Sequence, residues 1–579
     1  MKFLLSASIF IPIVGALIVA LLPKSEEKWA RSLSLIVASI QTIISVYVLI
    51  LFQKNSSTQN GLFPVEAFQF VEQYNWVLIR LGSLGILKIE YFLGLDGLNA
   101  SMMLLTAIVM FVAVMASWEI QHKIRAYYSL LLLTSGSVMG CFLALDFFLF
   151  YVFFEFMLIP MYFLIGIWGG ERKEYASIKF FIYTLLGSIL ILIVMIGLYI
   201  SAIDPLETAN LLDMPAVESQ ERRIIGIQTM IGQNLIPKER LVHTFSFIHL
   251  GDPGNFIPYS FLSLQNPNYV MGIHPRLFAF LLLLVGFLIK LPAVPLHTWL
   301  PDAHVEAPTP ISVVLAGILL KIGGYGLLRV GYLIFPEGAI HFAKLIGFLG
   351  VVAIIYAGLN ALGSKNLKKM IAYSSISHMG FVLLGIASLT HEGMNGAVFQ
   401  MFSHGLISSM LFLLSGVLYV RTKDLTIVHY SGLFQKMPLY AGFVAVAFFA
   451  SIGLPGFSSF VAEVFVFLGA FSSNALNGLL PAALPIFATL GLVISAAYYL
   501  WCYQRMFLRK FWTFYHDKIN SFSDVSLLEK SLLILLTCLI VLYGIYPNLH
   551  FSITSDTLSK LVESVSVNGL RNYHVLPLK

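Results

Sequence analysis

The stretch KLPAVPLHTWLPDAHVEAPTPISVVLAGILLKIGGYGLLR, residues 290–329, decides the fold class of this chain. Lys290 lies 13 residues into one predicted apolar span, just before a proline-rich interruption, and Lys321 lies equally far into the next span. A charged side chain near the centre of a bilayer costs at least about 2.5 to 3.5 kcal/mol on insertion scales. A lysine inside a membrane span is therefore expected to have a role that offsets this cost. The stretch indicates two membrane helices around a polar site.

The composition of the whole chain agrees with this interpretation. Its 579 residues are 58% hydrophobic and 11% charged, with a mean hydropathy of +0.86. Soluble domains contain about 25% charged residues, so a water-soluble fold is excluded. Apolar runs of bilayer-spanning length recur from end to end. We predict an all-α, multi-pass membrane protein.

Hydropathy predicts about fourteen transmembrane helices. Their ranges are 3–22, 31–52, 94–118, 126–145, 147–168, 177–201, 277–300, 308–334, 341–363, 367–390, 394–420, 438–470, 481–510 and 529–548. The first lacks the basic start and the small-residue cleavage site of a signal peptide, so we keep it as a helix. The predicted units are helices one to three (1–125), a first repeat of helices four to eight (126–340), a second repeat of helices nine to thirteen (341–510), and helix fourteen with its tail (511–579).

Two predicted helices contain an interruption close to an ionisable residue. In helix seven Lys290 precedes the prolines of 291–295, and in helix twelve residues 453–457 precede Glu463. The two lie five helices apart, which predicts two five-helix repeats, and an odd number of helices per repeat makes the second copy inverted. Broken helices at matching positions indicate an ion site, because unwound backbone is tolerated in a membrane only where it lines a polar cavity.

Basic residues gather in the short loops after odd-numbered helices. They are Lys24, Lys28, Arg31, Lys123, Arg125, Arg172, Lys173, Lys365, Lys368, Lys369, Arg421, Lys423 and Lys436. By the positive-inside rule these loops face the cytoplasm, which places both termini on the other side. The turn-rich stretch 203–276 is expected there too. It is interpreted either as a variable surface loop or as a contact surface for a neighbouring subunit.

Four residues carry the expected chemistry: Glu155, Lys290, Lys321 and Glu463. A static buried ion pair that holds helices together is the simpler explanation for the first three. A relay explains more, because loss of water favours a neutral lysine and a nearby carboxylate favours the charged form again. Movement or protonation of the carboxylate would then switch whether the lysine holds its proton.

Histidines supply possible intermediate stations, since their unperturbed pKa lies near neutrality. The candidates are His297, His378 and His404, for each of which a hydrogen-bonded packing role is the alternative. We expect His304 to be more exposed, and either to help proton entry or to hold a turn. Asp302, His304 and Glu306 offer no second histidine at helical spacing, so we predict no metal site.

Other chemistries have no evident site in the sequence. Cys141, Cys502 and Cys538 stand alone in apolar runs, which favours neither disulfides nor iron–sulfur or zinc centres. There is no strand-borne Gly-x-Gly-x-x-Gly and no Walker motif, so no nucleotide site is predicted. The formal net charge of +6 lies in loops rather than in a patch that suits nucleic acid. Energy must reach the chain from a partner or from an ion gradient.

Four stretches resemble the antiporter-like membrane subunits of complex I, NADH-quinone oxidoreductase, and in particular the M-type subunit, which is equivalent to subunit 4 of the mitochondrial enzyme. They are residues 290–329, 146–169 (DFFLFYVFFEFMLIPMYFLIGIWG), 369–380 (KMIAYSSISHMG) and 451–463 (SIGLPGFSSFVAE). A glutamate rather than a lysine at position 463 is the M-type pattern. The enlarged loop 203–276, and Ser459 in place of an expected glycine, depart from the family.

The resemblance implies a fourteen-helix fold with inverted repeats and a proton-translocating role within an enzyme whose redox centres lie elsewhere. Glu155 and Lys290 would be the coupling pair, Lys321 the central lysine, His378 and His404 part of the polar axis, and Glu463 its last residue. Flavin, iron–sulfur clusters and quinone would belong to partner subunits, and no cofactor to this chain. The expected partners are other membrane subunits of complex I, above all the neighbouring antiporter-like subunits, and the lipid of a bacterial-type inner membrane.

Two alternatives remain open at this point. The same residues suit a subunit of a multi-protein sodium/proton antiporter driven by an ion gradient without redox chemistry, or a subunit of a related membrane-bound hydrogenase complex. The run 302–308 (DAHVEAP) favours the complex I form moderately. A purely structural scaffold is the least favoured hypothesis, because it gains nothing from four costly charges inside the membrane.

Overall fold

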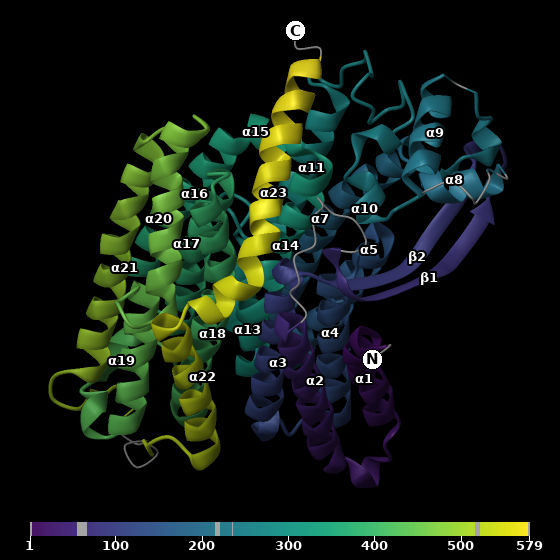
Figure 1. Ribbon diagram of the computed structural model, residues 1–579. Helices are drawn as coiled ribbons and strands as arrows, with labels where there is room; N and C mark the ends of the chain where they lie inside the picture. Colours follow the sequence, from purple (N-terminus) through teal and green to yellow (C-terminus); the bar gives the residue numbers. More distant parts are fainter. Residues whose placement is uncertain are drawn as a thin grey trace.

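The computed structural model describes residues 3–54, 67–212, 214, 220–233, 235–515 and 522–576. Residues 213, 215–219 and 234 of the predicted loop 203–276, and residues 516–521 and 577–579 of the predicted C-terminal unit, lie outside the described residues. Long helices run side by side to form the body of the molecule, and a β-hairpin with several short helices covers one end (Figure 1). We call that end the hairpin face.

The N-terminal part combines three helices with the hairpin. The elements are α1 (Leu4–Leu21), α2 (Trp29–Lys54), β1 (Gln69–Arg80), β2 (Ile86–Leu95) and α3 (Gly97–Ala116). β1 and β2 pair antiparallel, and β3 (Val242–His243) adds to β2 in parallel. The predicted mostly helical membrane fold is confirmed, but the sheet was not predicted, because neither strand of the hairpin contains an apolar run long enough to cross a bilayer.

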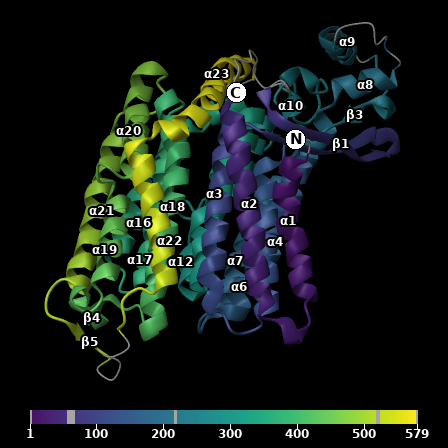
Figure 2. The same ribbon diagram turned by 60° about the horizontal axis from the view of Figure 1, so that its bottom comes forward.

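The next segment contains the predicted helices four to six and the covering layer. Its helices are α4 (Ile124–Leu143), α5 (Phe147–Phe156), α6 (Leu158–Trp168), α7 (Lys173–Ser201), α8 (Pro205–Leu211), α9 (Gln220–Gly232) and α10 (Phe247–Leu250). α8 and α9 lie with the hairpin at the end of the body where α1 begins (Figure 2). The stretch 203–276 is thus a layer that contains helices and a strand, joined to the hairpin by backbone hydrogen bonds such as that from Ile86 N to Leu241 O (2.9 Å).

The quoted stretch 290–329 lies within a series of helical pieces that runs from residue 275 to residue 341. They are α11 (Pro275–Lys290), α12 (Trp299–Glu306), α13 (Thr309–Val314), α14 (Leu320–Gly326) and α15 (Pro336–His341), with π-helical turns at Leu315–Leu319 and Leu327–Tyr332. The predicted span 277–300 is divided, since α11 ends at Lys290 and α12 begins at Trp299. Pro292 and Pro295 lie in the gap, where a residue without a backbone N–H cannot continue a helix.

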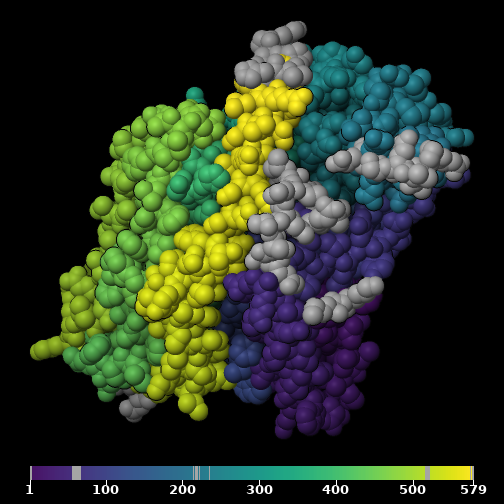
Figure 3. All heavy atoms as spheres, in the orientation of Figure 1, coloured from purple at the N-terminus to yellow at the C-terminus, as the bar shows by residue number. Residues whose placement is uncertain are grey.

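In the described residues after α15 the regular elements are helices and two very short strands, β4 (Tyr430–Ser431) and β5 (Trp512–Thr513). Its helices are α16 (Ala343–Leu362), α17 (Leu367–Ala387), α18 (His391–Thr422), α19 (Pro438–Ile452), α20 (Ser458–Leu476), α21 (Ala483–Phe507), α22 (Leu527–Ile545) and α23 (Asn548–Val575). The predicted span 438–470 is divided between α19 and α20. The long helix α23, which the sequence analysis treated as a tail, lies along the surface between the two halves of the molecule (Figure 3).

Among the described residues, thirteen helices are long and apolar enough to cross a membrane. They differ in what surrounds them: the most apolar parts of 309–332 and 391–422 are 100% buried, whereas those of α21 and α22 are only 33% and 28% buried. The central helices therefore contact protein on all sides, and the outer helices present apolar side chains to lipid. Charges on the central helices are shielded from the hydrocarbon.

Candidate functional site

The break after α11 places Lys290 at a helix end inside the protein. Its side chain is buried, and Nζ has no hydrogen-bond partner among the described residues. The ammonium lies over the Phe154 ring, 4.8 Å from the centroid, and close enough to Glu155 and Cys141 to interact electrostatically. Glu155 is half-buried near the end of α5, and its Oε1 also lacks a hydrogen-bond partner in the part of the chain that the structure describes. The two groups lie near one another without a closed ion pair.

Lys321 occupies the centre of the molecule, on α14 between the two π-helical turns. Its ammonium donates to the Ala316 carbonyl (2.5 Å) and to Nδ1 of His404 on α18 (2.8 Å). With Lys321 charged, Nδ1 of His404 is the acceptor of this hydrogen bond, since an ammonium only donates. π-helical turns inside a helix are frequent at functional sites, and here they surround the lysine.

Close backbone packing joins α14 to the end of α11. A Cβ on Gly323 would lie 2.5 Å from Leu291 N and 2.7 Å from Phe287 O. Only glycine allows this approach, which brings the helix of Lys321 against the broken end that carries Lys290. The spacing of glycines in the sequence did not reveal the contact.

The polar groups continue from His404 to Glu463. The rings of His404 and His378 are 5.5 Å apart between centroids, and His378 Nδ1 lies 3.6 Å from Glu463 Oε1. Gln400 Nε2 donates to the same Nδ1 (3.2 Å). All of these side chains are buried. The structure thus brings together four of the predicted residues, Lys321, His404, His378 and Glu463, from α14, α18, α17 and α20.

The surroundings of Glu463 explain two unusual residues. Gly453 adopts φ +82°, and a Cβ there would lie 2.5 Å from Glu463 Oε2, so this position requires glycine. Ser459, where the family resemblance led us to expect a glycine, donates its hydroxyl proton to Glu463 Oε1 (3.1 Å). The break between α19 and α20 therefore presents the carboxylate to His378.

Several contributing residues escaped the sequence analysis. Ser451 Oγ lies 3.1 Å from His378 Nε2 and donates to Tyr499 OH (2.7 Å), which donates to Ser374 Oγ (2.9 Å). These hydroxyls form a side branch of the polar chain. The serines next to His378 were a usable signal, whereas nothing in the local sequence distinguishes Tyr499 from a packing residue.

Two histidines lie differently from expectation. His297 is buried in the gap between α11 and α12, with its ring 5.4 Å from Tyr356 and 6.3 Å from Tyr373, and no contact among the described residues joins it to His378 or His404. The expected greater exposure of His304 is wrong. It is fully buried, stacked 4.4 Å from Phe412, because α12 packs against the core instead of forming a surface loop.

The run 302–306 does not converge on one point. Asp302 pairs with Lys179 (2.7 Å), Glu306 accepts from Arg172 N (3.0 Å), and His304 stacks on Phe412. Among the described residues no group of three or more potential ligands is arranged to hold a metal ion.

Comparison with known proteins shows the family of this chain. The family model described as "NADH:quinone oxidoreductase/Mrp antiporter, TM" matches residues 144–238 and 259–488. NADH-quinone oxidoreductase subunit M of Rhodobacter capsulatus is 35% identical over 575 residues, which cover 99% of this chain and 98% of that protein. The chain belongs to the M-subunit family of NADH-quinone oxidoreductase.

Two solved structures share the fold of this chain. A chain of respiratory complex I from Thermus thermophilus with bound NADH is 26% identical, with a TM-score of 0.72 and coverage of 97% of this chain and 99% of that one. A chain of the Mrp complex from Dietzia sp. has a TM-score of 0.73 at 17% identity, with coverage of 98% and 100%. The second likeness concerns the fold alone.

Proposed function

We propose that this chain is the proton-translocating M subunit of an NADH-quinone oxidoreductase. NADH oxidation and quinone reduction, with their flavin, iron–sulfur clusters and quinone, take place in partner subunits, and neighbouring antiporter-like subunits adjoin this one in an inner membrane. The observation that carries the proposal is a buried series of side chains from four helices: Lys321, His404, His378 and Glu463. Lys321 Nζ lies 2.8 Å from His404 Nδ1, the two imidazole centroids are 5.5 Å apart, and His378 Nδ1 lies 3.6 Å from Glu463 Oε1.

Each group has a defined task in this proposal. Lys321 holds a proton at Nζ and passes it to His404 Nδ1, which already accepts its hydrogen bond. His404 and His378 exchange the proton between neighbouring rings, directly or through one water. Glu463 receives it beside His378. Glu155 controls Lys290 electrostatically, and the contact of Gly323 with the end of α11 links that pair to Lys321.

The positive-inside pattern supports an orientation with the hairpin face on the non-cytoplasmic side. Leu5 N, at the start of α1, donates to Glu72 of β1 (2.9 Å), so the N-terminal end of the chain lies at this face. α23 ends there as well (Figures 1 and 2). We propose accordingly that both termini are non-cytoplasmic.

Glu155→Gln and Lys290→Ala are expected to lower NADH-driven proton uptake by the whole complex in proteoliposomes. Each change removes one member of a coupled pair. A positioned proton-transfer group typically raises the rate of proton transfer on the order of 10²- to 10⁴-fold. Proton uptake per NADH oxidised is measured beside quinone reductase activity. Wild-type uptake in both variants contradicts the proposal.

Matched controls for these variants lie on the surface of the same chain. Glu392→Gln and Lys344→Ala remove the same charges from exposed positions. Both are expected to pump like the wild type, which separates the effect of the buried pair from a general effect of net charge.

A further inference from the structure

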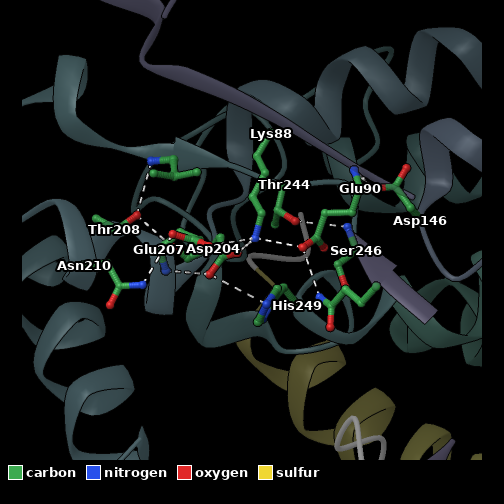
Figure 4. Close-up of polar contacts among 12 residues, drawn as sticks. Lys88, Glu90, Asp146, Asp204, Glu207, Thr208, Asn210, Thr244, Ser246 and His249 are labelled. Atoms are coloured by element: carbon green, nitrogen blue, oxygen red, sulfur yellow. Dashed lines mark hydrogen bonds and ion pairs between the residues drawn. The ribbon is translucent and has the colours of Figure 1, made fainter. Parts of the chain in front are cut away.

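The stretch 203–276 carries a buried cluster of charges that the proposed relay does not use. Lys88 of β2 lies at its centre, 2.8 Å from Glu90, 2.9 Å from Asp204 and 3.4 Å from Glu207. His249 Nε2 lies 3.7 Å from the other oxygen of Asp204. Figure 4 shows the acidic groups converging on the Lys88 ammonium from β2 and from the start of α8, with His249 of α10 beside them. The cluster joins the hairpin to α10.

The backbone around this cluster is tied to the start of α5. Phe147 N donates to Phe245 O (2.8 Å) and Phe247 N donates to Leu145 O (3.0 Å), while Asp204 N donates to Val242 O (2.7 Å). Asp146, which caps α5 through Leu149 N (3.0 Å), also accepts from Glu90 N (3.3 Å). The position of α10 is therefore fixed by the hairpin on one side and by α5 on the other.

Phe247 of α10 begins a column of buried aromatic rings that leads to Lys290. Its centroid lies 6.3 Å from that of Phe150, which lies 5.9 Å from Phe154, and the Lys290 ammonium lies 4.8 Å above the Phe154 ring. Phe147 and Phe287 pack against the sides of this column. Among the described residues the rings of the column carry no polar group, and Tyr325, which packs beside Phe150 (6.3 Å between centroids), donates its hydroxyl proton to the Phe142 carbonyl (2.8 Å).

Water has access to the other side of α10. A hollow of about 620 Å³ at the hairpin face is lined by residues that include Ile248, Asp252, Asn568 and Arg571. Ile248 lines the hollow and follows Phe247 directly, so the hollow and the column of rings meet at α10. Phe247 is the ring of the column that lies nearest to the hollow along the chain.

We propose that Phe247 and the rings beneath it form a seal that closes the route between Lys290 and the aqueous phase at the hairpin face, with Lys88 and Asp204 as the positioning residues that hold it. The proposal rests on the proposed function, in which Lys290 carries an exchangeable proton. A pump needs such a barrier, because a proton that returns by this route dissipates the gradient.

The charges of the cluster persist across the working range of pH. Burial lowers the pKa of Lys88, but Asp204 and Glu90 outweigh it and hold this pKa above its usual range. Burial raises the pKa of Asp204, but His249 and Lys88 outweigh it and lower this pKa. The stability that charged Lys88 contributes is fully present below about pH 10.4 and is lost as pH rises through its folded pKa. The stability that charged Asp204 contributes is fully present above about pH 3.9 and is lost as pH falls through its folded pKa. The ion pair of Lys88 and Asp204 therefore persists between these two pH values.

Phe247→Ala is expected to let protons leak through the complex without turnover. The whole complex is reconstituted in vesicles without NADH or quinone, a potassium diffusion potential is imposed, and proton influx is followed with an entrapped pH-sensitive dye. We expect a severalfold faster influx in Phe247→Ala and in Lys88→Met, and wild-type influx in Phe247→Leu and Lys88→Arg. If Phe247→Ala does not assemble, Phe247→Val removes the ring with a smaller loss of volume.

The double variant Phe247→Ala/Lys290→Met locates the leak. Removal of Lys290 should return influx to the wild-type rate, and a persistent leak would overturn the proposed route. Tight vesicles with Phe247→Ala would overturn the seal, and tight vesicles with Lys88→Met would overturn the positioning role. NADH-driven pumping by Lys290→Ala tests the proposed function separately, since that measurement does not depend on Phe247.

Discussion

Replacing Lys321 with methionine is expected to abolish proton uptake through this chain. Lys321 is fully buried, and its ammonium is the donor to His404 at 2.8 Å, so methionine fills the space but removes the proton carrier. The loss of a positioned proton-transfer group lowers the rate of proton transfer on the order of 10²- to 10⁴-fold. Proton uptake per NADH oxidised by the whole complex in proteoliposomes is the measurement.

Lys321→Arg separates a relay from a static charge. Arginine keeps a positive charge at all working pH values and cannot release its proton, so it should restore a structural ion site but not proton transfer. His404→Gln is the matching change on the acceptor side, since an amide accepts a hydrogen bond without taking up a proton. Wild-type pumping by Lys321→Arg would refute the relay.

Arg276→Met is expected to cause the largest loss of stability. The guanidinium is fully buried, pairs with Glu337 (Nε to Oε1, 2.5 Å), and donates to the carbonyls of Leu262 (3.0 Å) and Ile334 (2.7 Å). Its removal leaves the Glu337 carboxylate buried without its countercharge, which costs about 3 to 5 kcal/mol. The assay is thermal unfolding of the purified complex, followed by the amount of this subunit that stays assembled.

The double variant Arg276→Met/Glu337→Gln removes the unpaired charge as well and should recover much of the loss. Asp556→Asn, which removes the exposed partner of Lys560, serves as the surface control and should change stability by less than about 0.5 kcal/mol. If Arg276→Met unfolds at the wild-type temperature, the pair has no stabilising role. Because Asn572 of α23 donates to Glu337 (3.3 Å), the same experiment tests whether this pair fixes α23 to the hairpin face.

Local sequence was sufficient for the features that depend on composition and spacing. Apolar runs of bilayer length identify spans whatever their neighbours are, because the cost of lipid exposure acts on each helix separately. The same cost makes Lys290, Lys321 and Glu463 conspicuous, since an ionisable residue far from either end of an apolar run requires partners. Prolines beside two of them located the divided spans 277–300 and 438–470.

Features that depend on contacts between distant segments were not visible in the sequence. His297, His378 and His404 look alike as single histidines in apolar runs, yet the structure joins only the last two to Lys321 and Glu463. His304 was expected to be more exposed and is buried, since a short helix with polar residues can pack inward once a larger body surrounds it. The hairpin and α23 were not predicted because neither contains a long apolar run. The Lys88 cluster was not predicted because its members come from separate segments of the chain.

The sequence by itself determined that this chain spans a membrane many times and contains ionisable groups inside its spans, because each residue contributes separately to the free energy of transfer into lipid. Only the tertiary structure decided which groups meet. A hydrogen bond such as that from Lys321 to His404 requires approach to 2.8 Å across 83 positions of sequence. That approach is set by packing between helices, at contacts such as Gly324 of α14 against Met401 of α18, and no local pattern encodes it.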